Sequence, residues 1–203
     1  MSGRIVVLIS GTGSNMSALV AACEEGSVPG EVVLVAADRA CTGLEAAERV
    51  GIETLLLEPK GFASRDEWGD ALRDEIVSRR PDLVVSAGFM RILPPRFIDA
   101  FDDRLINLHP SLLPAFPGAH GVRDALEAGV KETGSTIHFV DYEVDHGPII
   151  AQEAVAIVPG DTVESLHEKI KEVEHRLLPA VCKMLLLGRV HMEGGRVTID
   201  DGR

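Results

Sequence analysis

Cysteine, aromatic residues and long apolar runs are all scarce in this sequence of 203 residues. Its three cysteines, Cys23, Cys41 and Cys182, lie far apart and include no C-x-x-C pair, which argues against a disulfide framework or a zinc knuckle. We expect them to be small buried residues in a reducing compartment. No apolar run approaches the roughly 20 residues of a membrane span, and no secretory pattern opens the chain. We therefore expect a cytoplasmic protein.

Positive charge is also in deficit, with 20 Lys and Arg against 32 Asp and Glu and a formal net charge of −12. Non-specific nucleic-acid binding and polybasic membrane attachment both need a basic surface, so we expect neither kind of partner. An anionic small substrate is still compatible with this charge, because a pocket sets its own local potential with a few cations. Repeats and low-complexity segments are absent from the sequence.

The chain does contain a regular alternation of apolar runs with helical patterns. Continuous apolar runs at 5–9, 32–35, 54–57 and 83–85 are typical of strands covered on both faces. Later strands are expected at 105–109, 136–140 and 149–157, followed by a hairpin at 190–199. This alternation predicts an α/β, Rossmann-like fold with a mostly parallel sheet and helices on both faces.

Two capping-box patterns predict where helices begin. Ser64 with Glu67 predicts one start, and Asp161 with Glu164 predicts the start of a longer helix. The apolar stripe of the longer helix is expected at Leu166, Ile170, Val173 and Leu177. No interdomain linker is visible, so we expect a single domain over 1–203.

A glycine-rich turn at 10–15 joins the first strand to a helix. Backbone N–H groups and the helix dipole favour an anion at such a helix start. The third glycine of the dinucleotide fingerprint is Met16 here, which weakens a nicotinamide-cofactor interpretation. Ser14 and Asn15 can donate side-chain hydrogen bonds, which suits a terminal phosphate. The alternative is a plain tight turn with Ser14 or Asn15 as the helix cap.

Two polar residues interrupt the strand at 105–109. Asn107 and His109 lie two apart, so both project from one face, at the strand end where open α/β sheets bind ligands. A hydrogen-bonded pair in the core is the alternative. Asp145, just before Gly147 and Pro148, puts a carboxylate on a tight turn, although it could simply form that turn.

Together these three side chains suit acyl transfer from a formyl carbonyl to an amine. The attack builds negative charge on oxygen, to which Asn107 and His109 can donate hydrogen bonds. His109 can also carry a proton, since imidazole titrates near neutrality. Asp145 can orient the imidazole and favour its protonated form.

Other catalytic signatures are missing. There is no H-E-x-x-H pattern, and we expect no metal. Ser111 lacks the G-x-S-x-G context of a serine nucleophile, and the cysteines have no obvious activating partner. Direct transfer between two bound substrates is therefore the simpler chemistry. We expect structural or surface roles for His138 and His167.

Four segments of the chain resemble phosphoribosylglycinamide formyltransferases, in that family's order. They are G-T-G-S-N at 11–15, A-G-F-M-R-I-L at 87–93, N-L-H-P-S-L-L-P at 107–114 and D-H-G-P at 145–148. The last two are typical of the wider folate-linked formyltransferases, whereas the first looks like this family's phosphate loop. The extra domains of methionyl-tRNA formyltransferases and formyltetrahydrofolate hydrolases have no counterpart here, which favours the same family. One departure is that only His120 remains of the histidines that often follow the Pro-Gly.

The resemblance implies transfer of a formyl group from the co-substrate 10-formyltetrahydrofolate to glycinamide ribonucleotide, in purine biosynthesis. The implied catalytic residues are Asn107, His109 and Asp145. The implied ribotide-binding residues are Gly13, Ser14, Asn15, Met16, Ser17, Lys171 and Glu174. The implied folate-binding residues are Arg65, Met90, Arg91, Ile92, Leu93, Asn107, Asp141, Tyr142, Glu143, Val144 and Asp145.

Several alternatives stay open at this point. A ribotide-binding part at about 1–100 and a folate-binding, catalytic part at about 101–203 are expected, in a monomer or homodimer. Phe97–Phe101 could serve a dimer contact or the core, and Lys171 and Glu174 could be solvated surface charges. Rival functions are another formyl-transferring or deformylating enzyme, and a nucleotide-binding regulatory module that uses only the glycine loop.

Overall fold

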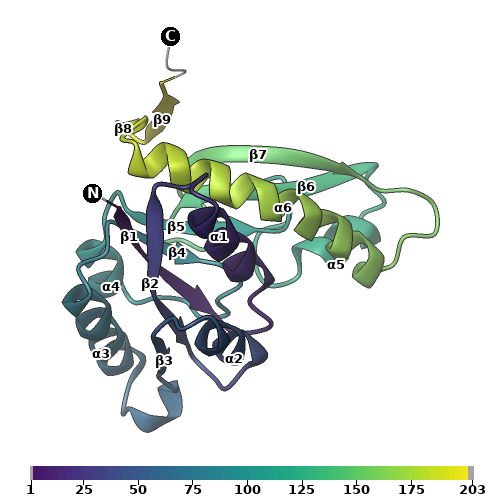
Figure 1. The fold of residues 1–203 in the computed structure, drawn as a ribbon. Helices are drawn as coiled ribbons and strands as arrows, with labels where there is room; N and C mark the ends of the chain where they lie inside the picture. The colour runs from purple at the N-terminus through teal and green to yellow at the C-terminus, as the bar shows by residue number, and fades with distance from the viewer. Residues whose placement is uncertain (1, 201–203) are drawn as a thin grey trace.

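The computed structural model describes residues 2–200, and its centre is a seven-stranded sheet in the order β3-β2-β1-β4-β5-β6-β7 (Figure 1). The first five strands run parallel, and they are β1 (Gly3–Ile9), β2 (Gly30–Ala37), β3 (Thr54–Leu56), β4 (Leu83–Ser86) and β5 (Leu105–His109). β6 (Glu132–Phe139) is antiparallel to both β5 and β7 (Ile149–Ala156). The predicted Rossmann-like, mostly parallel α/β fold is confirmed.

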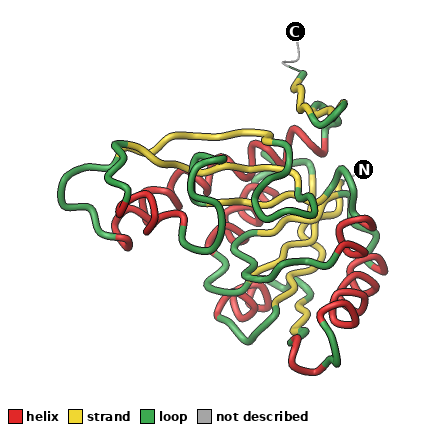
Figure 2. The backbone as a smooth tube through the Cα atoms, turned by 180° about the vertical axis from the view of Figure 1, so that it is seen from behind, coloured by secondary structure: helices red, strands yellow, loops and turns green. Residues whose placement is uncertain are grey.

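Helices cover both faces of the sheet, as Figure 2 shows from behind. One face carries α1 (Ser14–Glu24), α2 (Thr42–Arg49) and the long α6 (Val163–Leu186). The other carries α3 (Arg65–Ser78), preceded by the short η1 (Pro59–Gly61), and α4 (Pro95–Ala100). α5 (Gly121–Glu127) packs with β7 and α6 in a smaller cluster. Among the described residues, no helix combines the length and the apolar character needed to cross a membrane.

Strict alternation along the buried strands decides which side chain reaches which face. Val7 and Ile9 pack on the α1/α6 side, whereas Val6 and Leu8 pack on the α3/α4 side. In β5, Leu105 packs on the α3/α4 side, whereas Ile106 and Leu108 pack on the α1/α6 side. The polar residues of β5 therefore project from the α3/α4 face, close to the carboxyl ends of the neighbouring strands.

The predicted helix starts are partly right. Ser64 caps α3 by accepting a hydrogen bond from the Glu67 amide, as expected. At α6, however, the capping box is Thr162 with Ser165, one residue later than predicted, because Asp161 accepts bonds from Lys169 instead. The predicted stripe of α6 is buried except for Leu177, which is only partly buried.

Three further expectations concern the C-terminal hairpin, the segment Phe97–Phe101 and the cysteines. The C-terminal hairpin is present as β8 (Val190–Glu193) and β9 (Arg196–Ile199). Phe97 and Phe101 are fully buried and pack against each other, so the dimer-contact reading of that segment is wrong. Within the described residues all the cysteines are free, with Cys182 buried and the other two partly buried.

Candidate active site

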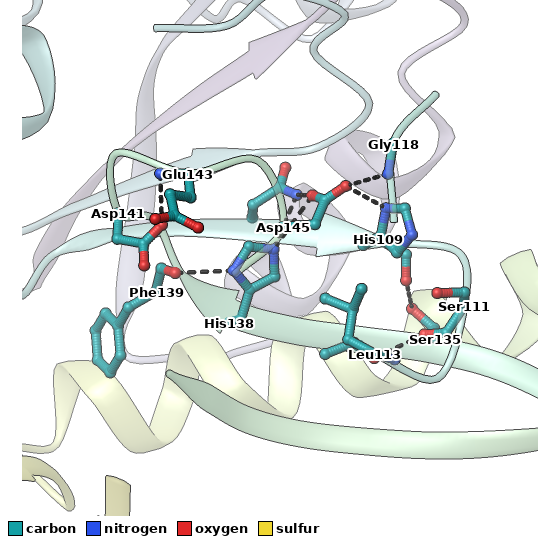
Figure 3. A network of polar contacts seen from close by, with 12 residues as sticks. His109, Ser111, Leu113, Gly118, Ser135, His138, Phe139, Asp141, Glu143 and Asp145 are labelled. Carbon is teal, nitrogen blue, oxygen red and sulfur yellow. Dashed lines mark hydrogen bonds and ion pairs between the residues drawn. The ribbon is translucent and has the colours of Figure 1, made fainter. Parts of the chain in front are cut away.

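His109 and Asp145 face each other at the end of β5 (Figure 3), and Asn107 of the same strand also contacts Asp145. The His109 Nδ1 atom lies 3.3 Å from Asp145 Oδ2. The Asn107 amide donates from Nδ2 to Asp145 Oδ1 at 3.2 Å. His109 and Asp145 are almost wholly buried, with side-chain exposures of 5% and 9%. The three polar residues that the sequence singled out are thus brought together from two separate parts of the sheet.

The loop at 140–148 holds Asp145 in place through a sharp turn between β6 and β7. Asp145 itself adopts a left-handed φ of 55°. Gly147 approaches β6 so closely that a Cβ atom there would lie 1.8 Å from the Phe139 carbonyl oxygen. Only glycine fits this position, because any side chain would push the loop away from the strand. The tight turn that the sequence predicted is therefore what brings the carboxylate back over β5.

Asp145 is held as a carboxylate. Burial would raise its pKa, but a hydrogen bond from His138, another from the Gly118 amide and the nearby charge of His109 outweigh burial and lower it. The Gly118 N–H donates to Oδ2 at 2.7 Å, the same oxygen that faces His109. At neutral pH the site therefore contains a buried carboxylate beside the His109 imidazole.

His138 belongs to this network, although the sequence suggested only a structural or surface role. It pairs with Asn107 in the register of β5 and β6 and is 2% exposed. Its Nδ1 donates to the Phe139 carbonyl at 2.8 Å, and its Nε2 lies 3.2 Å from Asn107 Nδ2. The same Nε2 atom lies 3.6 Å from Asp145 Oδ1, so the His138 ring contacts both members of the Asn107–Asp145 pair. In the sequence, His138 stood out only as a polar residue in an apolar strand. Its contact with Asn107 depends on how β5 and β6 pair.

The second nitrogen of His109 is also occupied. Nε2 lies 2.8 Å from the carbonyl oxygen of Phe116, which has a left-handed φ of 55°. Gly121 packs against the same atoms, since a Cβ there would lie 3.2 Å from Nε2. Both imidazole nitrogens therefore face oxygen acceptors, and the segment at 115–121 covers the ring.

The glycine loop leaves a helix start open to a ligand. Gly13, with φ 72°, is the N-cap of α1, and within residues 2–200 no side chain bonds to the free amides of the first turn. The alternative of Ser14 or Asn15 as the cap is therefore wrong. Gly43 packs directly against this turn, because a Cβ on Gly13 would lie 3.1 Å from its Cα. Such an uncapped helix start attracts anions.

Asn15 and Glu174 are brought together from opposite ends of the chain. Asn15 Nδ2 donates to Glu174 Oε2 at 2.7 Å, and Ser135 Oγ donates to Oε1 at 3.3 Å. Glu174 is only 4% exposed, so the surface-charge alternative is wrong for this residue. Asn15 Oδ1 is buried and has no hydrogen-bond partner among the described residues.

Other predicted ribotide-binding residues are placed differently. Lys171 pairs with Glu168 at 2.7 Å and does not contact the Asn15–Glu174 cluster through any hydrogen bond in the described chain. The Met16 side chain is 1% exposed and packs in the core, so only its backbone faces the loop. Ser17 is exposed, and its amide bonds to the Gly13 carbonyl.

Apart from Arg65 and Asn107, the predicted folate-binding residues lie in two segments, 90–93 and 141–145, which follow β4 and β6, the two neighbours of β5. Met90, Ile92, Tyr142 and Val144 leave large apolar side chains exposed, between 52% and 67%. Leu93 is the exception, because its side chain is buried in the α3/α4 cluster. Arg65 is exposed at the first residue of α3. Arg91 donates from Nε to Asp38 Oδ2 at 2.7 Å, a partner that the sequence did not suggest.

The loop at 141–147 is itself held by polar contacts. Asp141 accepts from the Glu143 amide and from His146 Nδ1, both at 2.9 Å. Tyr142 donates to Asp99 on α4. A cavity of about 230 Å³ opens beside this loop, and Asp145 lies in its wall. Its remaining lining is Leu113, Pro114, Pro117, Glu143, Val144, His146, Gly147 and Ile149.

Known proteins share both the sequence and the architecture of this chain. A family model described as formyl transferase matches residues 3–182. A phosphoribosylglycinamide formyltransferase from Mycobacterium tuberculosis is 47% identical, over 97% of this chain and 94% of its own. One from Escherichia coli is 42% identical, over 98% of this chain and 95% of its own. The crystal structure of glycinamide ribonucleotide transformylase 1 from Symbiobacterium toebii superimposes with a TM-score of 0.96 at 46% identity, covering 98% of this chain and 95% of that one.

Proposed function

Because this chain belongs to the formyl transferase family, we propose that it transfers the formyl group of 10-formyltetrahydrofolate to the amine of glycinamide ribonucleotide. The products are formylglycinamide ribonucleotide and tetrahydrofolate, in de novo purine biosynthesis. The observation that carries the proposal is the convergence of Asn107, His109 and Asp145 at the end of one strand. We assign the enzyme to the cytoplasm, as a monomer or homodimer that acts on small molecules.

The two substrates approach from opposite faces of the sheet. The α1 helix start and the buried Glu174 lie on the α1/α6 side, where they suit the phosphate and the ribose hydroxyls of the ribotide. The exposed apolar side chains of 88–93 and 141–145 suit a flat heteroaromatic ring such as the pterin. The end of β5 lies between these regions, because Ser135 contacts both Glu174 and the His109 carbonyl. The amine and the formyl carbon therefore meet beside His109.

In the reaction, the amine nitrogen attacks the formyl carbon, and the bond from that carbon to folate nitrogen breaks. The protonated His109 donates from Nε2 to the developing oxyanion, which takes the place of the Phe116 carbonyl. Asp145 remains ionised and balances the imidazolium charge. The amine loses one proton and the departing folate nitrogen gains one, so a proton relayed at this site balances the transfer.

Asn107 contributes by orientation as well as by donation. Its amide nitrogen donates to Asp145 and also lies 3.2 Å from His138 Nε2. Donation to the oxyanion therefore requires Asn107 to leave its contact with His138, because the bond to the charged Asp145 carboxylate is the stronger. In the resting site, these bonds hold the Asp145 carboxylate against His109.

The test is an assay of formyl consumption with and without the acceptor. We expect tetrahydrofolate to form only when glycinamide ribonucleotide is present, in equal amount with the formylated ribotide. Release of formate at a similar rate without the acceptor would instead indicate a deformylating enzyme on the same scaffold. A shift of the unfolding temperature by NAD, with none by the folate, would favour a nucleotide-binding regulatory module.

A further inference from the structure

A second polar network lies outside the catalytic residues, at the ends of β1 and β2. Its centre is Asp38, whose carboxylate side chain is fully buried. Ser10 Oγ donates to Asp38 Oδ1 at 2.6 Å, and Arg91 Nε donates to Oδ2 at 2.7 Å. Arg39 donates to both oxygens, from Nε at 3.2 Å and from Nη2 to Oδ2 at 2.9 Å. Each oxygen of this carboxylate thus accepts from at least two side chains.

The bonds of this network end on the segment at 88–91. The Ser10 amide donates to the Gly88 carbonyl at 3.1 Å, and the Met90 amide donates to Ser10 Oγ at 2.8 Å. Arg91 adds a third attachment through its bond to Asp38. Gly88, Met90 and Arg91 are thus all hydrogen-bonded to residues at the ends of β1 and β2. Strand alternation places Ser10 and Asp38 on the α3/α4 side, the same face as Asn107.

This part of the segment has little other support. Phe89 and Leu93 are buried, but Met90 and Ile92 expose 54% and 58% of their surface. The backbone at Met90 and Arg91 is therefore held by polar bonds rather than by the packing of its own side chains. A buried carboxylate is a costly way to gain stability alone, because apolar residues of similar volume often serve as well or better.

We propose that Ser10 and Asp38 are positioning residues that fix the backbone at 88–91 in the conformation that binds the folate co-substrate. The inference rests on the proposed function, because that function makes this segment part of the folate site. Ser10 and Asp38 act through Met90 and Arg91 and do not touch the reacting atoms. The ionised state of Asp38 supports the role: burial would raise its pKa, but hydrogen bonds from Arg39, Ser10 and Arg91 lower it to about 2.

The experiment compares Asp38→Asn and Ser10→Ala with the wild type in steady-state kinetics and in calorimetric binding of 10-formyltetrahydrofolate. Ser10→Ala removes the acceptor of the Met90 amide, and Asp38→Asn removes the charge that strengthens the Arg91 bond, so we expect KM and Kd for the folate to rise about tenfold. We expect kcat and KM for the ribotide to stay within about twofold of the wild type, because Asn107, His109 and Asp145 are unchanged. The double variant should show about the same rise as either single variant, because both changes break one network.

Asp70→Asn is the matched control. Asp70 on α3 also pairs with two arginines, Arg73 at 2.5 Å and Arg96 at 3.3 Å, but it makes no hydrogen bond to the 88–91 segment within residues 2–200. We expect this variant to leave KM for the folate unchanged. Circular dichroism and thermal unfolding establish that each variant is folded, and Ser10→Ala carries the test if Asp38→Asn is not.

Two outcomes overturn the positioning role. One is an unchanged folate Kd in folded Ser10→Ala. The other is an equal loss in kcat and in both KM values, which indicates a general structural defect. Failure of the wild type to transfer formyl to the ribotide counts against the proposed function, and the folate Kd of the variants still decides the positioning role. Failure of the wild type to bind the folate overturns both.

Discussion

The imidazole of His109 and the carboxylate of Asp145 face each other across 3.3 Å, although one ends a strand and the other lies in the hairpin loop of two later strands. Each also has a backbone partner, the Phe116 carbonyl for the imidazole and the Gly118 amide for the carboxylate. The loop that covers the site thus offers an acceptor to the imidazole N–H and a donor to the carboxylate oxygen. Several consequences of this arrangement can be measured.

His109→Ala and Asp145→Asn should each lower kcat by about 10²–10³-fold. In the proposed mechanism, the first removes the proton carrier and oxyanion donor, and the second removes the negative charge that faces the imidazole. Steady-state kinetics at saturating substrates measures the change, with circular dichroism to establish that the fold is intact. Near-normal turnover in either folded variant would show that the proposed mechanism is wrong.

Glu174→Gln should raise KM for the ribotide about tenfold and change kcat less. Its carboxylate accepts from Asn15 and Ser135, so the neutral amide weakens the contact that is proposed for the ribose. Glu172→Gln serves as the control, because Glu172 is exposed on the same helix. An equal effect of the two substitutions would refute a specific role for Glu174.

Gly147→Ala should reduce both stability and turnover. The added Cβ meets the Phe139 carbonyl, so the loop must move and carry Asp145 with it. We expect the free energy of unfolding to fall by about 1–3 kcal/mol, measured by urea denaturation. Gly26→Ala is a useful comparison, because Gly26 has a left-handed φ of 76° but no close neighbour for a Cβ within the described chain. Only Gly147→Ala should lower kcat.

The contribution of Asp38 to stability should depend on pH. Its pKa is lowered from 3.8 to about 2 in the folded protein. The stabilisation is therefore complete above the unfolded pKa and is lost as the pH falls through the folded value. The difference in unfolding free energy between the wild type and Asp38→Asn should narrow by about 1 kcal/mol from about pH 6 to about pH 3. A difference that stays constant over this range would mean that ionised Asp38 contributes no net stability.

The strands could be predicted because their signals are local. Continuous apolar runs mark strands buried on both faces, and Asn107 and His109 stand out because they interrupt one. The cap of α6 was misplaced by one residue because neighbouring Asp161 and Thr162 are both good capping residues, and packing around Lys169 decides between them.

The remaining partners could not be predicted, because they depend on register and on contacts distant in the chain. His138 joins the trio only through the pairing of β6 with β5. Asp38, followed by Arg39 after a strand, looks like an ordinary turn residue until Ser10 and Arg91 are seen around it. The pairing of Lys171 with Glu168 on its own helix was likewise not predicted.

The most direct test follows the formyl carbon itself. Purified protein is given 10-formyltetrahydrofolate labelled with ¹³C in the formyl group, together with unlabelled glycinamide ribonucleotide, and the products are followed by NMR. We predict that the label appears on the ribotide amine as tetrahydrofolate forms, with no labelled formate, and that Asp145→Asn nearly abolishes this signal. Labelled formate in place of labelled ribotide, or full transfer by the folded Asp145→Asn variant, would contradict direct transfer by this trio.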